Sequence, residues 1–297
     1  MRTLKTLAAS AAVAALMLAG TAAQAAPCGA GINFGAAFAA DYSCTTLGTP
    51  SGIPANLGGL TFLDNNTLLI GGAANGGSGV IRMIDVLRDG NNHIIGFDGV
   101  SSAFADAPYI DGGLAYGPGG VLFATTFSNN TLLQFKPGSA SPDKIIDLTA
   151  EGIASSTGTL QFVPLGFNGA GGFKIASYSA GTWYDVTLTA DGSGTYDIGA
   201  VTYINTPGRG PEGIVYVDGA NDGFGVDRCC CRNSAPAAWA PMTSTPAATW
   251  SWPAAATSSP ASAAPRARSS TRSPATSCFP PSAAATRSWS SAALSGR

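Results

Sequence analysis

The sequence predicts an all-β protein, an incomplete β-propeller of four-stranded antiparallel blades. The clearest blade lies between Gly112 and Leu148, where four short apolar runs alternate with turn-forming segments. Glycine and asparagine supply the positive φ that tight hairpins need, and proline fixes φ at a turn corner. Four strands joined by short hairpins form a sheet of blade size. The runs are Leu114–Tyr116, Val121–Thr126, Leu132–Lys136 and Lys144–Leu148.

A recurring start pattern is the second observation that predicts a propeller. The order small, aliphatic, any, aromatic occurs four times at intervals of about 46–54 residues, which is typical of longer propeller blades. Each unit leaves one apolar sheet face that only a neighbouring blade covers. A β-sandwich or a barrel is the alternative architecture. The starts are Gly59–Phe62, Gly113–Tyr116, Thr159–Phe162 and Gly213–Tyr216.

The units around the clearest blade follow the same turn chemistry, with Asp64-Asn65-Asn66 as a tight-turn signal. A polar loop over 98–109 is expected to close the first unit, and the fourth unit opens at 213–217. The expected strands of the first unit are 60–63, 67–70, 80–86 and 93–97, and those of the third are 160–163, 173–178, 182–188 and 195–201.

The N-terminal residues 1–25 have the features of a secretory signal peptide. Arg2 and Lys5 form a positive region, and Leu7–Ala19 is apolar but short for a bilayer span. Ala23–Ala25 fits a cleavage site. The sequence therefore predicts export to the periplasm or the extracellular space, with no membrane span after cleavage. A signal anchor is the alternative.

Residues 26–57 are predicted to form an N-terminal arm and residues 58–227 the propeller. In an exported chain, the spacing of Cys28 and Cys44 predicts a disulfide that pins the arm. Pro27 before Cys28 argues against lipidation.

A net charge of −2, with 11% charged residues, gives no electrostatic basis for binding nucleic acid or an anionic membrane.

The composition changes abruptly after Asp227. Residues 228–297 contain no Val, Ile, Tyr, Asp, Glu, Lys, His or Gln and are mainly Ala, Ser, Pro, Thr and Arg. Such a segment lacks the β-branched residues of strands, and its prolines oppose helix. We therefore expect a disordered, low-complexity tail.

Two interpretations of this tail remain open. One is a natural low-complexity tail or cell-wall linker. The other is a shift of reading frame near residue 227, because a two-base shift lets the codons of Ser277–Pro281 read as L-F-S-T-F, close to Leu122–Phe127. In that case Cys229–Cys231 is neither a metal nor a disulfide motif, and the product is expected to be marginally stable or misfolded.

The start pattern, together with Gly166–Phe173 and Pro211–Ile214, resembles secreted bacterial propeller-like proteins. Their broad relatives are the NHL and SMP-30/gluconolactonase-like propellers, and some exported proteins of this kind carry a PEP-CTERM sorting signal. The resemblance covers residues 58–227. It implies the fold more than an activity, because its motifs are short and structural.

The predicted site lies where the innermost strands begin. Asp111, Thr157 and Glu212 precede the start patterns at nearly equivalent offsets, and Arg209 is close in sequence. The resemblance to SMP-30-like enzymes implies a divalent metal held there by carboxylates and an amide. Ca²⁺ takes about six to eight oxygen ligands. The alternative is that these residues cap turns or accept backbone N–H bonds.

Other chemistry-bearing residues are expected to be structural. His93 is the only histidine and is expected at the surface. Trp183 and Tyr184 could stack on a sugar, but packing on a blade face is the favoured interpretation.

The sequence therefore favours an exported, non-enzymatic binding or surface protein, whose partner is a small molecule, a glycan or a protein. A metal-dependent hydrolase similar to gluconolactonases is one alternative. A non-functional product of a shifted frame is another.

Overall fold

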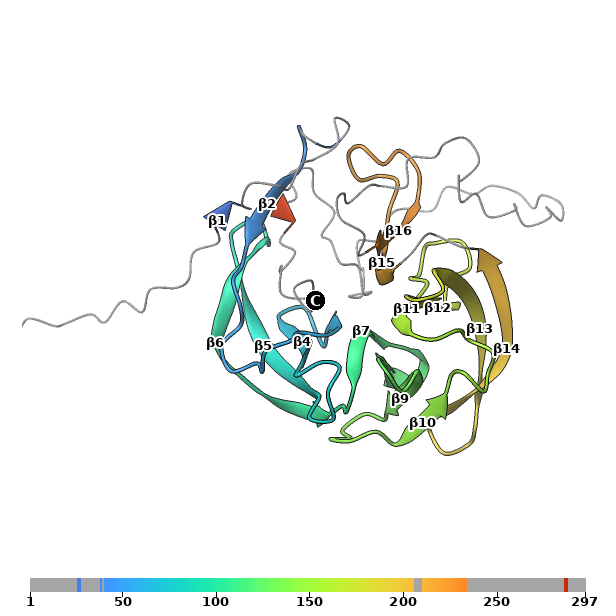
Figure 1. Cartoon of the computed structure of the whole chain (residues 1–297). Coiled ribbons are helices and arrows are strands. Elements are labelled where there is room, and N and C mark those ends of the chain that lie inside the picture. The colour runs from blue at the N-terminus through green and yellow to red at the C-terminus, as the bar shows by residue number, and fades with distance from the viewer. Residues whose placement is uncertain (1–25, 28–37, 39, 206–209, 234–285, 288–297) are drawn as a thin grey trace, which may run out of the picture.

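The computed structural model describes residues 26–27, 38, 40–205, 210–233 and 286–287. In this part of the chain the protein is all-β, and its one helical element is the short 3-10 turn η1 (Pro118–Gly120). Three four-stranded antiparallel sheets and a two-stranded sheet follow one another along the chain (Figure 1). The predicted all-β class and the four-stranded antiparallel sheets are confirmed, and the propeller arrangement stays a prediction.

Within each of these sheets the spatial order of the strands equals their order in the sequence. We number the sheets 1 to 4 along the chain. Sheet 1 contains β3 (Leu60–Phe62), β4 (Thr67–Gly72), β5 (Val80–Arg88) and β6 (Ile94–Asp106); sheet 2 contains β7 (Ile110–Tyr116), β8 (Leu122–Thr126), β9 (Thr131–Phe135) and β10 (Lys144–Asp147); sheet 3 contains β11 (Thr157–Phe162), β12 (Phe173–Ser177), β13 (Thr182–Ala190) and β14 (Tyr196–Asn205); sheet 4 contains β15 (Pro211–Val217) and β16 (Arg228–Asn233).

The hairpins form as their turn residues predict. Asp64 accepts hydrogen bonds from the backbone N–H groups of Asn66 and Thr67, both at 2.8 Å, and so closes the β3–β4 turn. Ser128 and Asn130 adopt positive φ in the β8–β9 turn. Short polar side chains tolerate this conformation, which is why these turns need no glycine there.

One predicted loop is a strand. The sequence predicts that the last strand of the first unit ends at Phe97, but β6 continues to Asp106. Its second half pairs with the start of β5, from Val80↔Asp106 to Met83↔Ser102, across bulges. β5 is long enough to pair with both halves of β6. This backbone pairing outweighs the polar composition that suggested a loop.

The first strands of successive sheets approach one another through glycine. A Cβ built on Gly112 would lie 2.3 Å from the carbonyl oxygen of Gly158, and one built on Gly158 would lie 2.2 Å from that of Pro211. Gly59 N–H donates to the Asp111 carbonyl at 2.7 Å. No side chain fits in these contacts, so main chain meets main chain, and β7, β11 and β15 turn toward a common centre in Figure 1.

Apolar side chains fill the space between the sheets. One cluster joins sheets 1 and 2, with Leu69, Ile81 and Phe135 among its buried members. A second joins sheets 2 and 3, where Phe123 and Phe173 lie with ring centroids 5.6 Å apart. The far face of sheet 1 is covered by arm residues that include Ile53 and Leu57.

The N-terminal arm carries its own small sheet. β2 (Ser43–Thr46) pairs antiparallel with β1 (Ala26–Pro27) and parallel with β17 (Thr286–Arg287). Cys44 is disulfide-bonded. Cys28 lies outside the described residues, so its pairing with Cys44 stays a prediction.

The predicted boundary after Asp227 coincides with the start of a strand. β16 (Arg228–Asn233) pairs along its length with β15, with Val217↔Arg228 and Ile214↔Cys231 in register. The expectation that the chain is disordered from Arg228 onward is therefore wrong for these first residues. Backbone pairing requires no particular side chains, so the composition did not reveal it. Most of the predicted tail lies outside the described residues.

Replacing Gly158 with alanine should strain the contact between β11 and β15. The new Cβ would lie 2.2 Å from the Pro211 carbonyl oxygen, and overpacking of this kind costs about 1–3 kcal/mol. We expect the urea midpoint of Gly158→Ala to fall accordingly. Gly90→Ala is the matched control, because a Cβ at Gly90 would have no other atom within 4 Å. Equal loss of stability in the two variants would contradict the close approach of the inner strands.

Candidate functional site

Three of the predicted site residues lie at the starts of the inner strands. Asp111 is the second residue of β7, Thr157 the first of β11 and Glu212 the second of β15. The Gly112 Cβ position would be 2.3 Å from the Gly158 carbonyl oxygen and 2.8 Å from that of Glu212. The main chain beside all three residues therefore meets at Gly112. Arg209, the fourth predicted residue, lies outside the described residues.

Thr157 is fully buried at the start of β11, where the sequence predicted a ligand site. Its backbone N–H donates to Asn130 Oδ1 at 3.0 Å. Asn130 Nδ2 in turn donates to Thr149 Oγ1 at 3.0 Å and to the Ile153 carbonyl at 3.1 Å. Within the described part of the chain, the buried Thr157 Oγ1 has no hydrogen-bond partner.

Asn75 is a site residue that the sequence reasoning missed. It lies in the β4–β5 loop with φ of 65°, and its backbone N–H donates to the Ile110 carbonyl at 3.0 Å, next to Asp111. Its Oδ1 is buried and, among the described residues, lacks a hydrogen-bond partner. The offsets that found Asp111, Thr157 and Glu212 do not lead to Asn75, whereas the Asn75-Gly76 pair is a turn signal in the sequence that marks it.

The donor set at this end of the inner strands consists of oxygen atoms. Asp111 and Glu212 are half-buried and both take part in polar interactions, and Asn75 and Thr157 add an amide oxygen and a hydroxyl. Hard cations prefer such ligands, but Ca²⁺ takes about six to eight of them. The described residues also contain no group of three or more His, Cys, Asp or Glu placed to hold a metal. These residues do not form a complete Ca²⁺ site.

His93 is buried, so the expectation of a surface residue is wrong. It is 7% exposed and lies between β5 and β6, where Asp89 Oδ1 accepts its backbone N–H at 2.8 Å. Its Nδ1 lies 3.1 Å from Asp89 Oδ2. The backbone N–H of His93 is the main reason that the pKa of Asp89 is lowered. The pair closes the outer hairpin of sheet 1, far from the starts of the inner strands in the chain.

Trp183 and Tyr184 are packed inside sheet 3 and offer no sugar-stacking surface. They are 5% and 7% exposed. The Tyr184 hydroxyl oxygen accepts hydrogen bonds from Ala154 N–H at 3.2 Å and from Thr182 Oγ1 at 3.1 Å. Both side chains are packed against the rest of the protein, as the favoured interpretation of the sequence predicted.

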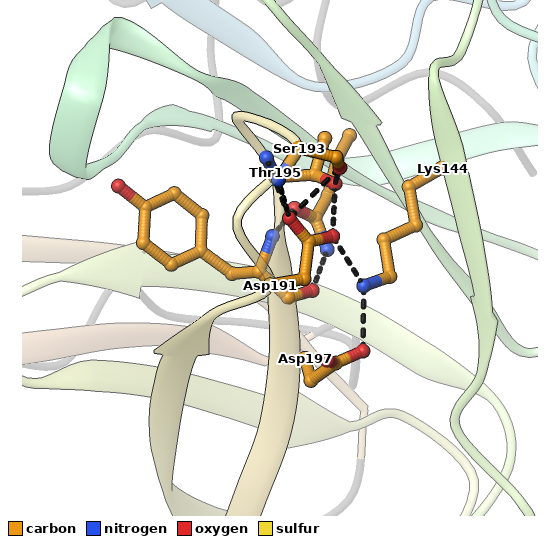
Figure 2. A network of polar contacts seen from close by, with 7 residues as sticks. Lys144, Asp191, Ser193, Thr195 and Asp197 are labelled. Carbon is orange, nitrogen blue, oxygen red and sulfur yellow. Dashed lines mark hydrogen bonds and ion pairs between the residues drawn. The ribbon is translucent and has the colours of Figure 1, made fainter.

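A second polar cluster joins the outer strands of sheets 2 and 3 (Figure 2). Lys144 Nζ on β10 lies 2.7 Å from Asp191 Oδ2 and 2.6 Å from Asp197 Oδ1. The side chain of Gln134, on β9, makes two hydrogen bonds to the main chain of Tyr196, one at 2.7 Å and one at 2.9 Å. Every one of these contacts crosses between the two sheets, so the cluster is a structural clamp.

The charges of this clamp stabilise each other. The hydrogen bond from Lys144 is the largest of the contacts that lower the pKa of Asp191, and Thr195 and the backbone N–H of Ser193 add to it. For Lys144, desolvation lowers the pKa, but the bonds to Asp191 and Asp197 outweigh it and the pKa is raised. Both groups are therefore charged over the whole ordinary pH range.

Comparison with known proteins assigns no family to the chain. No family model matches it, and no curated protein matches it significantly. In the part of the chain that the structure describes, no helix has the length and apolar character needed to cross a membrane.

Replacing Asp191 with asparagine should remove an acid-dependent part of the stability. The pKa of Asp191 is lower in the folded than in the unfolded chain, so its contribution is complete above the unfolded value of about 3.9 and is lost as the pH falls further. We expect the stability difference between wild type and Asp191→Asn to shrink below about pH 4 in urea unfolding. Asp98→Asn, at an exposed carboxylate, is the control. A difference that stays constant with pH would contradict this role.

Two buried threonines should respond oppositely to replacement with valine. Thr157 Oγ1 has no partner among the described residues, whereas Thr125 Oγ1 accepts the Gly113 N–H at 3.0 Å. Removing an unsatisfied buried hydroxyl should stabilise the free protein by about 1 kcal/mol, and removing a satisfied one should destabilise it by about 1–3 kcal/mol. Chemical unfolding measures both. Destabilisation by Thr157→Val would mean that an ordered partner occupies the site.

Proposed function

We propose that the chain is an exported binding protein with the architecture of an incomplete β-propeller. Its ligand is a small polar molecule, or a polar group of a glycan or protein, taken where the inner strands begin. The observation that carries the proposal is the pair of buried oxygens, Asn75 Oδ1 and Thr157 Oγ1, which lack partners among the described residues. Buried polar atoms are normally hydrogen-bonded, so such atoms mark places that a ligand or water completes.

The arrangement of the sheets supports the propeller. Sheets 1 to 3 each have four strands in chain order, and each sheet begins with a strand that contacts its neighbour through glycine. Blades of a propeller are built and joined in this way, with ligands bound near the axis. The features of a signal peptide in residues 1–25 support export.

The metal-dependent hydrolase is the weaker alternative. Two carboxylates, an amide oxygen and a hydroxyl fall short of the ligand number of Ca²⁺, and no histidine lies near the starts of the inner strands to act as a base. We therefore derive no catalytic step for this chain.

A shifted reading frame is the other alternative, and the change of composition at Arg228 is the observation behind it. The described part of sheet 4 has two strands, where sheets 1 to 3 have four, and its second strand starts where the composition changes. Two-stranded sheets are marginal alone. The DNA sequence at codons 226–229 separates a shifted product from a natural tail.

Thermal unfolding with candidate ligands tests the proposed binding function. A ligand that binds only the folded chain raises its melting temperature by mass action. We expect a shift with one or more neutral monosaccharides or amino acids, and a loss of that shift in Asp111→Asn. Asp98→Asn, away from the inner strands, should keep the shift. A shift with CaCl₂ alone would favour the hydrolase, and no shift with any of these probes would contradict a polar site.

A further inference from the structure

The sequence contains two Asn-Gly pairs, Asn75-Gly76 and Asn168-Gly169. We propose that Asn168-Gly169 is a site of spontaneous covalent modification, at which the asparagine deamidates through a cyclic imide in the folded protein. The fold protects Asn75-Gly76 from the same reaction. The proposal is independent of the proposed function.

The reaction requires only the chain and water. The backbone nitrogen of Gly169 forms a bond to Cγ of Asn168, and the bond from Cγ to the side-chain nitrogen breaks. The proton of the Gly169 N–H leaves with that nitrogen as ammonia. Water then adds to either carbonyl carbon of the imide, which gives aspartate or isoaspartate at this position. Glycine favours the attack because it has no side chain to obstruct the nitrogen and its backbone is permissive.

The surroundings of Asn168 leave both reacting groups available. Asn168 and Gly169 are exposed in the β11–β12 loop. The Asn168 side chain makes no hydrogen bond to any described residue, and the Gly169 N–H is likewise unbonded there. The Asn168-Gly169 peptide is held by two bonds of its own loop, from Ala170 N–H to the Phe167 carbonyl at 3.1 Å and from Gly172 N–H to the Gly169 carbonyl at 2.9 Å.

The loop can open without disturbing the core. Gly166, Gly169 and Gly171 all have positive φ, so the segment is rich in residues that rotate easily. Both bonds beside this peptide lie within the exposed loop, and each such bond is worth a factor of about two to ten in the opening equilibrium. Local opening of this size lets the Gly169 nitrogen reach Asn168 Cγ while the sheets stay folded.

Asn75-Gly76 has the same chemistry in a rigid setting. The Asn75 N–H donates to the Ile110 carbonyl at 3.0 Å, and the Gly76 carbonyl accepts from Gly79 N–H at 3.0 Å and Tyr109 N–H at 2.8 Å. The Asn75 side-chain oxygen is buried. Rotation of this peptide would break three hydrogen bonds to neighbouring backbone, which is why we expect protection.

The modification would change a contact between sheets 3 and 4. Phe167, the preceding residue, packs edge to face on Tyr216 of β15 with ring centroids 5.5 Å apart. Deamidation adds a negative charge beside this contact, and isoaspartate also lengthens the backbone of the loop. Ageing of the chain should therefore loosen the loop from sheet 4.

Peptide mapping of the full chain after incubation in mildly alkaline buffer tests the proposal. Mass spectrometry follows the exchange of amide for acid at both pairs, and an isoaspartyl methyltransferase assay detects isoaspartate. Relative to the rates in urea, we expect the folded protein to slow Asn75 more than Asn168, by a further factor of about two to ten for the third hydrogen bond alone. In urea both pairs should react at similar rates.

The variant Asn168→Gln gives the chemical control. Its longer side chain keeps the amide but forms the cyclic imide poorly, so the isoaspartate signal should disappear. Equal conversion at Asn75 and Asn168 in buffer would overturn the proposal. So would conversion of Asn168 to aspartate without isoaspartate, because that product distribution indicates direct hydrolysis of the amide.

Discussion

Main-chain contact between the inner strands is the constraint on which the rest of the structure depends. At Gly112 and Gly158 a single Cβ would lie within 2.3 Å of a neighbouring carbonyl oxygen, so only glycine lets β7, β11 and β15 approach this closely. That approach brings the starts of the strands together. Farther from these contacts, the buried faces around Phe123 and Phe173 fill the space between sheets 2 and 3.

The three junctions between sheets are secured to different degrees. Sheets 2 and 3 share an apolar cluster at the centre and the clamp of Lys144 with Asp191 farther out. Within sheet 3, Lys174 lies on the face opposite to the one that carries Phe173. The Lys174 side chain is only 2% exposed, and its Nζ forms an ion pair with Asp185 Oδ1 at 2.6 Å on the neighbouring strand. Among the described residues, no apolar cluster joins sheet 3 to sheet 4, so that junction depends mainly on glycine contacts and aromatic rings.

The strands could be predicted from local chemistry, whereas their extent and the burial of single residues could not. Turn residues such as Asp64 mark the hairpins, because their side chains bond to the adjacent backbone. The second half of β6 has polar and small residues, and only its pairing with β5 makes it a strand. Sequence offsets found Asp111 and Thr157. They missed Asn75, because its place depends on a contact with the distant Ile110, and they carry no information on the burial of His93 beside Asp89.

The candidate site depends little on the segment whose reading frame is in question. Asn75, Asp111 and Thr157 come from sheets 1 to 3, which are joined by the two apolar clusters. Glu212 alone comes from sheet 4, and it precedes the change of composition at Arg228. If the chain beyond that point were replaced by further strands, sheet 4 would gain pairing and cover, while the oxygens at the inner-strand starts would keep their places. Binding at this end can therefore be judged separately from the origin of the tail.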